Sequence, residues 1–512
     1  MKRYLILTVL ACLLLSGCTK PKNEPTVSRE ASENATVITL SDTAVQVNGK
    51  TAPTTSAAVY TAHDIVYYED GKDFTYGEGE KEDAHTAEEA NAHTVVHITE
   101  AGEYVLSGKL SAGQIAVDLG EDADKDPNAV VTLFLDGVDI TCTVAPAVIF
   151  YNVYECDTAE EASMDVDTSA AGANVVLVDD STNYLNGSYV AKIYKSVELS
   201  DDGTEVVDSK KLHKYDGALY SKMSMNVYGG PKGSGSVTIV AENEGWGSER
   251  HLTLYSGQMN IESGNDGVNA NEDGVSVIAI KGGQLDIVVN GKTGEGDGID
   301  SNGWLVIDGG GVTAAACGSS ADVGVDADNG VYLRGGKVRA TGNMYDHIAE
   351  GDCFVVFTFS KRQSGGDTYT CLSKDGKTAL TYTPTNDFQY LIIADPMLTE
   401  GEYTLKCGDT VLSVLASQAG GGMRPEGMTP PNGDFQKPEA NGEPPALPDG
   451  EQPTRPNGER PDMPQGEQPP MNGERPGHPN GERPNGFGGE QSTEASETFT
   501  IQKGANTFRV IL

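Results

Sequence analysis

The sequence predicts an all-β protein whose body is a parallel β-helix, a solenoid of short strands, with irregular loops and a C-terminal β cap. Three observations predict this fold class. No segment of about 12 residues has a convincing helical period in its apolar positions. The chain contains 62 glycines among its 512 residues, which favours a turn-rich structure. A pattern of strand, glycine-containing corner and strand recurs four times between residues 252 and 338.

The four copies of this pattern are spaced as a solenoid requires. They occupy residues 252–261, 277–287, 305–312 and 331–338. A strand rises about 3.3 Å per residue, so a unit of this length holds two or three short strands and their turns. The unit is shorter than a propeller blade, which needs about 40 residues. A β-sandwich with coincidental hairpins is the alternative, but four copies in one register favour stacked coils.

Stacked coils place equivalent apolar residues in rows that face the core. The predicted inward residues are Leu254, Ile280, Ile307 and Leu333 before the corner, and Met259, Leu285, Val312 and Val338 after it. Residues 156–172 and 198–215 are polar, and we expect them to be loops extruded from the coils. Residues 353–415 alternate without glycine corners, which predicts a cap with antiparallel strands.

The N-terminus predicts an exported, lipid-anchored protein. Residues 1–18 begin with two basic residues and continue with an apolar run that is too short to span a membrane. The segment ends in Leu-Ser-Gly-Cys, which resembles a bacterial lipobox in which Cys18 carries the lipid. An ordinary signal peptide is the alternative. Residues 19–35 are polar and are expected to form a tether.

The composition then divides the rest of the chain into three parts. Residues 36–418 are the predicted β-helix domain with its cap. Residues 419–492 are rich in Pro, Gly and Glu, which predicts a disordered loop. Apolar alternation returns in residues 493–512, so we expect a C-terminal strand that packs back onto the cap. Loop-closure entropy grows only slowly with loop length, so such an insertion is tolerable.

The charge of the chain limits its partners. A formal net charge of −40 excludes nucleic acid, because an acidic surface repels a phosphate backbone. The same surface attracts cations, and carboxylate oxygens are the ligands that calcium prefers. We expect a monomer at the extracellular face of a bacterial membrane, attached to the membrane only through its lipid.

The Asp-Gly-Val/Ile turns and Gly-Gly corners resemble a bacterial family of carbohydrate-binding domain proteins. Residues 130–150, 174–189 and 216–346 carry the resemblance. Members of this family are right-handed parallel β-helices similar to pectate lyases. The resemblance implies binding to an acidic polysaccharide such as polygalacturonate, or to a cellulosic one, with bound calcium. It does not establish catalysis.

Acidic residues in equivalent turns are the candidate calcium ligands. Carboxylates on successive coils lie about 4.8 Å apart and repel each other unless a cation bridges them. Simple Asx turns or exposed ladders are the alternative for each of these residues. The candidates that begin the turns are Asp266, Asp297 and Asp322, and those that follow are Asn269, Asp300 and Asp326. Second-rank candidates are Asn265, Glu295 and Asp328.

A sugar-binding face needs aromatic rings that stack on the sugar. The candidates are Trp246, Trp304, Tyr220, Tyr255 and Tyr332. Trp304 precedes an inward-alternating strand, so it could equally cover the core.

An enzymatic alternative is a polysaccharide lyase that acts by β-elimination on uronates. It needs calcium beside the sugar carboxylate and a basic residue to remove the proton. Arg334, Arg339 and Lys222 are the candidate bases. Residues 245–346 carry 14 acidic against six basic residues, and no basic cluster is present for an anionic substrate. Binding without catalysis is therefore the preferred function, and a structural or adhesive surface protein is the third possibility.

Overall fold

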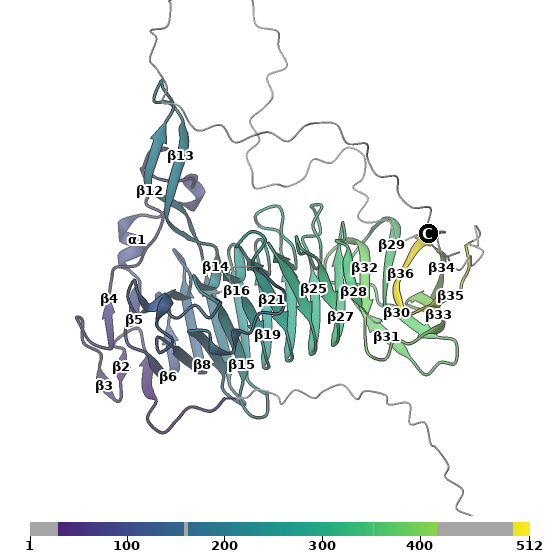
Figure 1. The fold of residues 1–512 in the computed structure, drawn as a ribbon, viewed down its shortest axis with the longest axis horizontal. Helices are drawn as coiled ribbons and strands as arrows, with labels where there is room; N and C mark the ends of the chain where they lie inside the picture. Colours follow the sequence, from purple (N-terminus) through teal and green to yellow (C-terminus); the bar gives the residue numbers. More distant parts are fainter. Residues whose placement is uncertain (1–28, 158–161, 352, 417–494) are drawn as a thin grey trace, which may run out of the picture. The chain divides into compact units, whose positions relative to one another are not determined.

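The computed structural model describes residues 29–157, 162–351, 353–416 and 495–512. All of them belong to one compact unit. The predicted signal peptide with Cys18, the start of the tether and the loop at residues 419–492 lie outside the described residues. The described chain is nearly all β, which confirms the predicted class (Figure 1). None of its helices has the length and apolar composition needed to cross a membrane.

Most strands belong to three parallel ladders, and successive strands along the chain join each ladder in turn. The first ladder is parallel throughout, except that β4 is antiparallel to β5. Its members are β4 (Val59–Ala62), β5 (Thr94–Ile98), β7 (Gly113–Asp118), β9 (Val148–Asn152), β14 (Gly217–Ser221), β17 (Glu244–Ser248), β20 (Val268–Ala270) and β23 (Ile299–Ser301).

The long strand β8 (Val131–Cys142) pairs into both the second and the third ladder. We call three successive strands, one from each ladder, a coil. The second ladder continues through β10 (Ala173–Leu177), β15 (Met225–Gly229), β18 (Leu252–Leu254), β21 (Val277–Ile280), β24 (Trp304–Ile307), β26 (Val331–Leu333) and β28 (Ile348–Gly351). The third continues through β11 (Thr182–Gly187), β16 (Ser236–Ala241), β19 (Gln258–Ser263), β22 (Gln284–Val289), β25 (Gly311–Ala315) and β27 (Lys337–Gly342).

The register places equivalent residues of successive coils in rows. Leu254 pairs with Ile280, which is followed in the same row by Ile307 and then Leu333. These four residues are at most 4% exposed. At the corner, Gly283 has a φ of +77°, and a Cβ atom there would lie 2.6 Å from the carbonyl oxygen of the preceding coil. The corner therefore requires glycine for both its conformation and its space.

A cap of mostly antiparallel strands with its own hydrophobic core follows the last coil. β27 pairs with the cap strand β32, which joins the two parts. The cap strands are β29 (Cys353–Gln363), β30 (Tyr369–Ser373), β31 (Ala379–Tyr382), β32 (Phe388–Ala394), β33 (Gly401–Cys407), β34 (Thr410–Ala416), β35 (Phe499–Ile501) and β36 (Gly504–Ile511). The C-terminal β36 lies between β29, to which it is parallel, and β34, to which it is antiparallel.

The N-terminal coils carry the remaining elements. Here β6 (Gly102–Leu110) pairs in parallel with β1 (Thr36–Leu40) and with β8, and β1 continues into the small strands β2 (Gln46–Val47) and β3 (Lys50–Thr51). The short helices are α1 (Ala87–Asn91), η1 (Lys81–Asp83), η2 (Ala123–Lys125) and η3 (Thr168–Ala170).

One sequence-based expectation is wrong. Residues 206–215, expected to lie in a loop, form β13 (Val206–Tyr215), which pairs with β12 (Val190–Leu199) as a two-stranded ribbon that projects from the body (Figure 1). The polar face of an exposed ribbon resembles a loop in composition, which explains the error.

Candidate functional site

The turns that enter β20 and β23 bring acidic side chains together on the first ladder. Asp266 and Asp297 precede these strands, and Asn269 pairs in register with Asp300. The backbone N–H of Asp297 donates to Asp266 Oδ1 at 2.7 Å, and the N–H of Val323 donates to Asp297 Oδ1. Each carboxylate thus links its own coil to the next one.

Among the described residues, three carboxylates on these coils lie close enough together to share a metal ion. One ligand oxygen from each of Asp297, Asp300 and Asp326 lies within 4.8 Å of the others. We call these three residues the acid cluster. All three are partly buried, so water does not fully screen their charges. Their spacing and hard oxygen donors fit a divalent cation of the calcium type.

Burial and neighbouring negative charges raise the pKa values of all three carboxyl groups in the acid cluster. Burial, followed by the charges of Asp266 and Asp328, raises the pKa of Asp300 to about 7. Burial and then the Asp346 charge likewise raise the pKa of Asp326 to about 7. Burial, followed by the charge of Asp266, raises the pKa of Asp297 well above its usual range. Near neutral pH these groups must either hold protons or share a cation.

A further acidic residue, Glu244, extends this arrangement to the preceding coil. It is 5% exposed, and burial and then Asp216 raise its pKa well above the usual range. Asn269 Nδ2 donates to Glu244 Oε1 at 3.0 Å and to Asp266 Oδ2 at 3.1 Å. Glu244 Oε2 and Asn269 Oδ1 are buried without a hydrogen-bond partner. Two orphaned oxygens beside buried carboxylates also fit a cation, because such oxygens are costly to leave unpaired.

Sequence reasoning missed Glu244 as a candidate ligand. The segment Glu244-Gly245-Trp246 belongs to a coil whose turn has no Asp, whereas the candidate turns all begin with Asp. Glu244 begins β17 and is level with Asp266, because Trp246 pairs with Val268, and this position was the available signal.

The remaining metal candidates lie around the acid cluster rather than in it. Asp322 Oδ2 accepts the N–H of Gly296 at 2.8 Å and a hydrogen bond from Ser320. The charge of Glu295 helps to raise the pKa of Asp266 to about 7, after burial and Asp322. The backbone N–H of Asn265 donates to the carbonyl of Asn243, which joins two successive turns.

Burial corrects two of the five predicted sugar-stacking rings. Trp246 is 0% and Tyr220 is 1% exposed, so both are core residues and cannot reach a ligand from solution. Tyr255 is partly exposed, but its faces are occupied. Its ring stacks on Tyr228 of the preceding coil at 4.7 Å between centroids, and Lys281 of the following coil lies 5.2 Å from its centroid. Trp304 and Tyr332 remain as partly exposed rings of the second ladder.

The three candidate bases have different surroundings. Arg339 donates to Asp395 at 2.8 Å and to the carbonyls of Val338 and Ala394, so it fastens the cap to the last coil and is not a free base. Arg334 is partly exposed and lies 3.6 Å from Asp165 and 3.7 Å from Glu350. The backbone of Lys222 donates to the carbonyl of Phe150. No contact joins any two of the three bases within the part of the chain that the structure describes.

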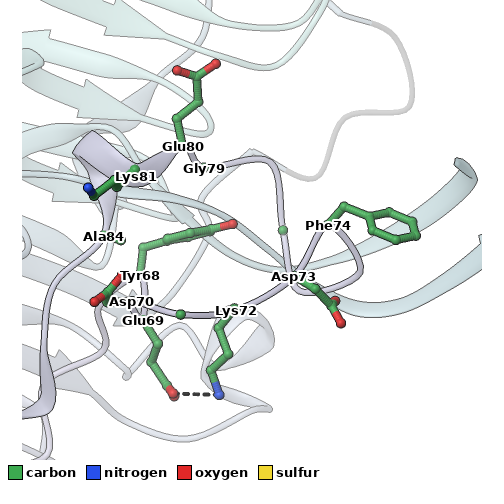
Figure 2. Close-up of a pocket in the computed structure, with 12 residues that line it drawn as sticks. Tyr68, Glu69, Asp70, Lys72, Asp73, Phe74, Gly79, Glu80, Lys81 and Ala84 are labelled. Atoms are coloured by element: carbon green, nitrogen blue, oxygen red, sulfur yellow. Dashed lines mark ion pairs between the residues drawn. The ribbon is translucent and has the colours of Figure 1, made fainter. Parts of the chain in front are cut away.

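A separate cavity of about 420 Å³ lies near the N-terminus, between residues 68 and 84. Its floor is Tyr68, and Glu69 and Lys72 form an ion pair of 2.7 Å at its edge. Figure 2 shows Phe74 and Glu80 directed away from Tyr68 rather than into the cavity. Because the polar groups do not converge, this cavity is a weaker candidate than the acid cluster.

The profile of a family described as carbohydrate-binding domain-containing protein matches residues 92–376, more than half of the chain. The chain belongs to this family. The acid cluster and both partly exposed rings lie inside the matched region, whereas the Tyr68 cavity lies outside it.

A curated member of this family gives a more distant match. A carbohydrate-binding domain-containing protein of Acetivibrio thermocellus is 28% identical over 169 residues, which are 33% of this chain. The match spans 45% of the relative, so this chain covers less than half of its length. No solved structure matches the chain.

Proposed function

We propose that the chain is a lipid-anchored protein of the bacterial surface that binds polysaccharide in a calcium-dependent way. Its coils form a right-handed parallel β-helix that is similar in design to a pectate lyase. The acid cluster of Asp297, Asp300 and Asp326 is the observation that carries this proposal. Membership of a carbohydrate-binding domain family supports a polysaccharide as the ligand.

Calcium connects the acidic protein with a glycan. The oxygens of the acid cluster would hold the ion, with Glu244, Asp266 and Asn269 as further donors on the neighbouring coils. When bound, calcium supplies positive charge and open coordination positions for a sugar carboxylate. Two polyanions do not associate without such a bridge, and the net charge of this chain is −40.

The lyase alternative has less support. Arg339 is engaged with Asp395, and Arg334 is the more exposed of these two candidate bases. A base must reach the proton that it removes, and no base contacts the acid cluster among the described residues.

A pull-down tests the glycan proposal. Wild-type protein should bind polygalacturonate in calcium and lose at least about ten-fold in affinity in a chelator, since each lost charge-bridging contact is worth about 1.5–3 kcal/mol. Asp300→Asn should reproduce most of the loss with calcium present. Asp201→Asn, at an exposed position of the ribbon, is the matched control and should bind as wild type. Equal binding by all three proteins with and without calcium would reject the calcium bridge.

The proposed anchor has a separate test. Replacing Cys18 by alanine removes the thiol that would carry the lipid, so Cys18→Ala should leave an uncleaved precursor or a protein released from the membrane. Membrane fractionation and intact-mass measurement check this result. A mature variant that still partitions with membranes would place the anchor elsewhere.

A further inference from the structure

The outer face of the second ladder carries two aromatic rings on consecutive coils. Leu305 pairs with Val331, so Trp304 is level with Gly330. The Tyr332 ring leans over Gly330, within 3.4 Å of the position that a Cβ atom would take there. Trp304 and Tyr332 therefore lie on adjacent strands, which are about 4.8 Å apart along the stacking direction.

One cation lies beside the Tyr332 ring, and a second belongs to the same ladder. The Arg334 guanidinium lies 5.3 Å from the centroid of the Tyr332 ring. Lys281 belongs to the same outward row as Arg334, two coils earlier, because the residues before them pair through Ile307. Asp308 lies between Lys281 and Arg334 in this row, so the row carries two positive charges and one negative charge in a chain whose net charge is −40. This face is suited to a ligand that has both sugar rings and negative charge.

A segment of the same chain, Met164–Thr168, lies across this face, and we call it the strap. Met164 and Val166 pack against the outward residues Val277 and Ala279 of β21 and Val306 of β24. At its other end, Thr168 Oγ1 is 2.7 Å from Thr253 Oγ1 on β18. The strap thus runs along the stacking direction, from β18 towards β26.

The strap presents carboxylates to the two cations. Asp165 Oδ1 lies 3.6 Å from Arg334 Nη1, and Arg334 Nη2 lies 3.3 Å from Met164 Sδ. The pKa of Asp167 is lowered mainly by hydrogen bonds from Ser169 and in smaller part by the charge of Lys281. An extended chain with two negative charges therefore occupies the face in the manner of an acidic glycan.

Apart from the apolar packing of Met164 and Val166, few interactions hold residues 164–167 in place. Among the described residues, no backbone–backbone hydrogen bond connects residues 164–167 to the ladder. The Asp165 side chain is 76% exposed, and its ion pair with Arg334 is long. Exposed ion pairs of this kind contribute little to stability because water screens them.

We propose that the strap is an intramolecular occupant of a glycan-binding face, and that an acidic polysaccharide displaces it and runs along the coils over Trp304 and Tyr332. This inference rests on the proposed function and extends it, since it assigns a contact surface apart from the acid cluster. The strand spacing is close to the length of one sugar unit in an extended glycan. The chain would therefore bind with about one sugar per coil.

Strap variants test this inference with polygalacturonate as the probe, in calcium. Asp165→Asn removes the competing charge and should tighten binding about two- to five-fold, the range expected for one exposed ion pair. Arg334→Gln should weaken binding by a similar factor, and Trp304→Ala by about ten-fold. Asp201→Asn is the matched control for Asp165→Asn, and calcium uptake by every variant should match that of wild type.

The outcomes separate this inference from the proposed function. If wild type binds the glycan but Asp165→Asn binds no more tightly than Asp201→Asn, the strap has only a structural role and the inference fails alone. Unchanged binding by both Arg334→Gln and Trp304→Ala would show that the glycan binds elsewhere. If neither wild type nor Asp165→Asn binds any glycan, both proposals fail.

Discussion

Deletion of residues 495–512 should unfold the C-terminal cap. β36 lies inside the cap sheet, and it contributes Phe508 and Val510 to the second core, while β35 contributes Phe499 and Ile501. Each large buried side chain lost from a core costs about 2–5 kcal/mol. The loss of four such side chains is therefore comparable with the whole 5–15 kcal/mol that stabilises a typical domain.

Calorimetry of the deletion variant should show a lost or strongly lowered unfolding transition. Two point variants distinguish the loss of core packing from the loss of the strands themselves. Phe508→Ala should destabilise the cap by about 3–5 kcal/mol, whereas Arg509→Ala, at the exposed position next to it, should change stability by less than about 0.5 kcal/mol. A deletion variant that melts like the full chain would show that the last two strands do not support the cap.

The calcium-free protein should lose stability as the pH rises from about 4 to about 7. Asp300 and Asp326 have folded pKa values of about 7, whereas an unfolded aspartate titrates near 3.9. In this window the folded state holds protons that the unfolded state has released, so raising the pH favours unfolding. A shift of three units corresponds to at most about 4 kcal/mol for each carboxyl group.

Thermal unfolding in a chelator at about pH 5 and about pH 8 checks this prediction. The Tm should be lower at the higher pH, and added calcium should raise it again, because the ion replaces the lost protons. Asp300→Asn removes one charge and should flatten the dependence in the chelator. A calcium-free Tm that is constant or rises over this range would contradict the electrostatic account of the acid cluster.

The repeat could be predicted because it depends on local pattern. Apolar residues equivalent to Leu254 and Met259 recur at a regular spacing in the sequence. A parallel register then places each set in a row on one side of its ladder. Asp297, Asp300 and Asp326 could be selected for the same reason, since equivalent turns of adjacent coils must lie side by side.

The burial of Trp246, the covering of the Tyr255 ring and the position of the strap depend on tertiary structure. Trp246 lies between Gly245 and Gly247, so its strand has no alternation of polar and apolar side chains that would reveal which side faces inward. The sequence around Tyr255 does not show that Tyr228 and Lys281 cover its ring. The strap has no periodicity, and its position follows only from contacts with residues about 90 to 170 positions later in the chain.

A calcium titration followed by a glycan titration, both by calorimetry on the native protein, tests the central claim most directly. The account predicts calcium uptake by wild type near neutral pH, reduced uptake by Asp300→Asn, and polygalacturonate binding only after calcium has been added. It is contradicted if the native protein takes up no calcium, or if polygalacturonate binds equally well to the calcium-stripped protein.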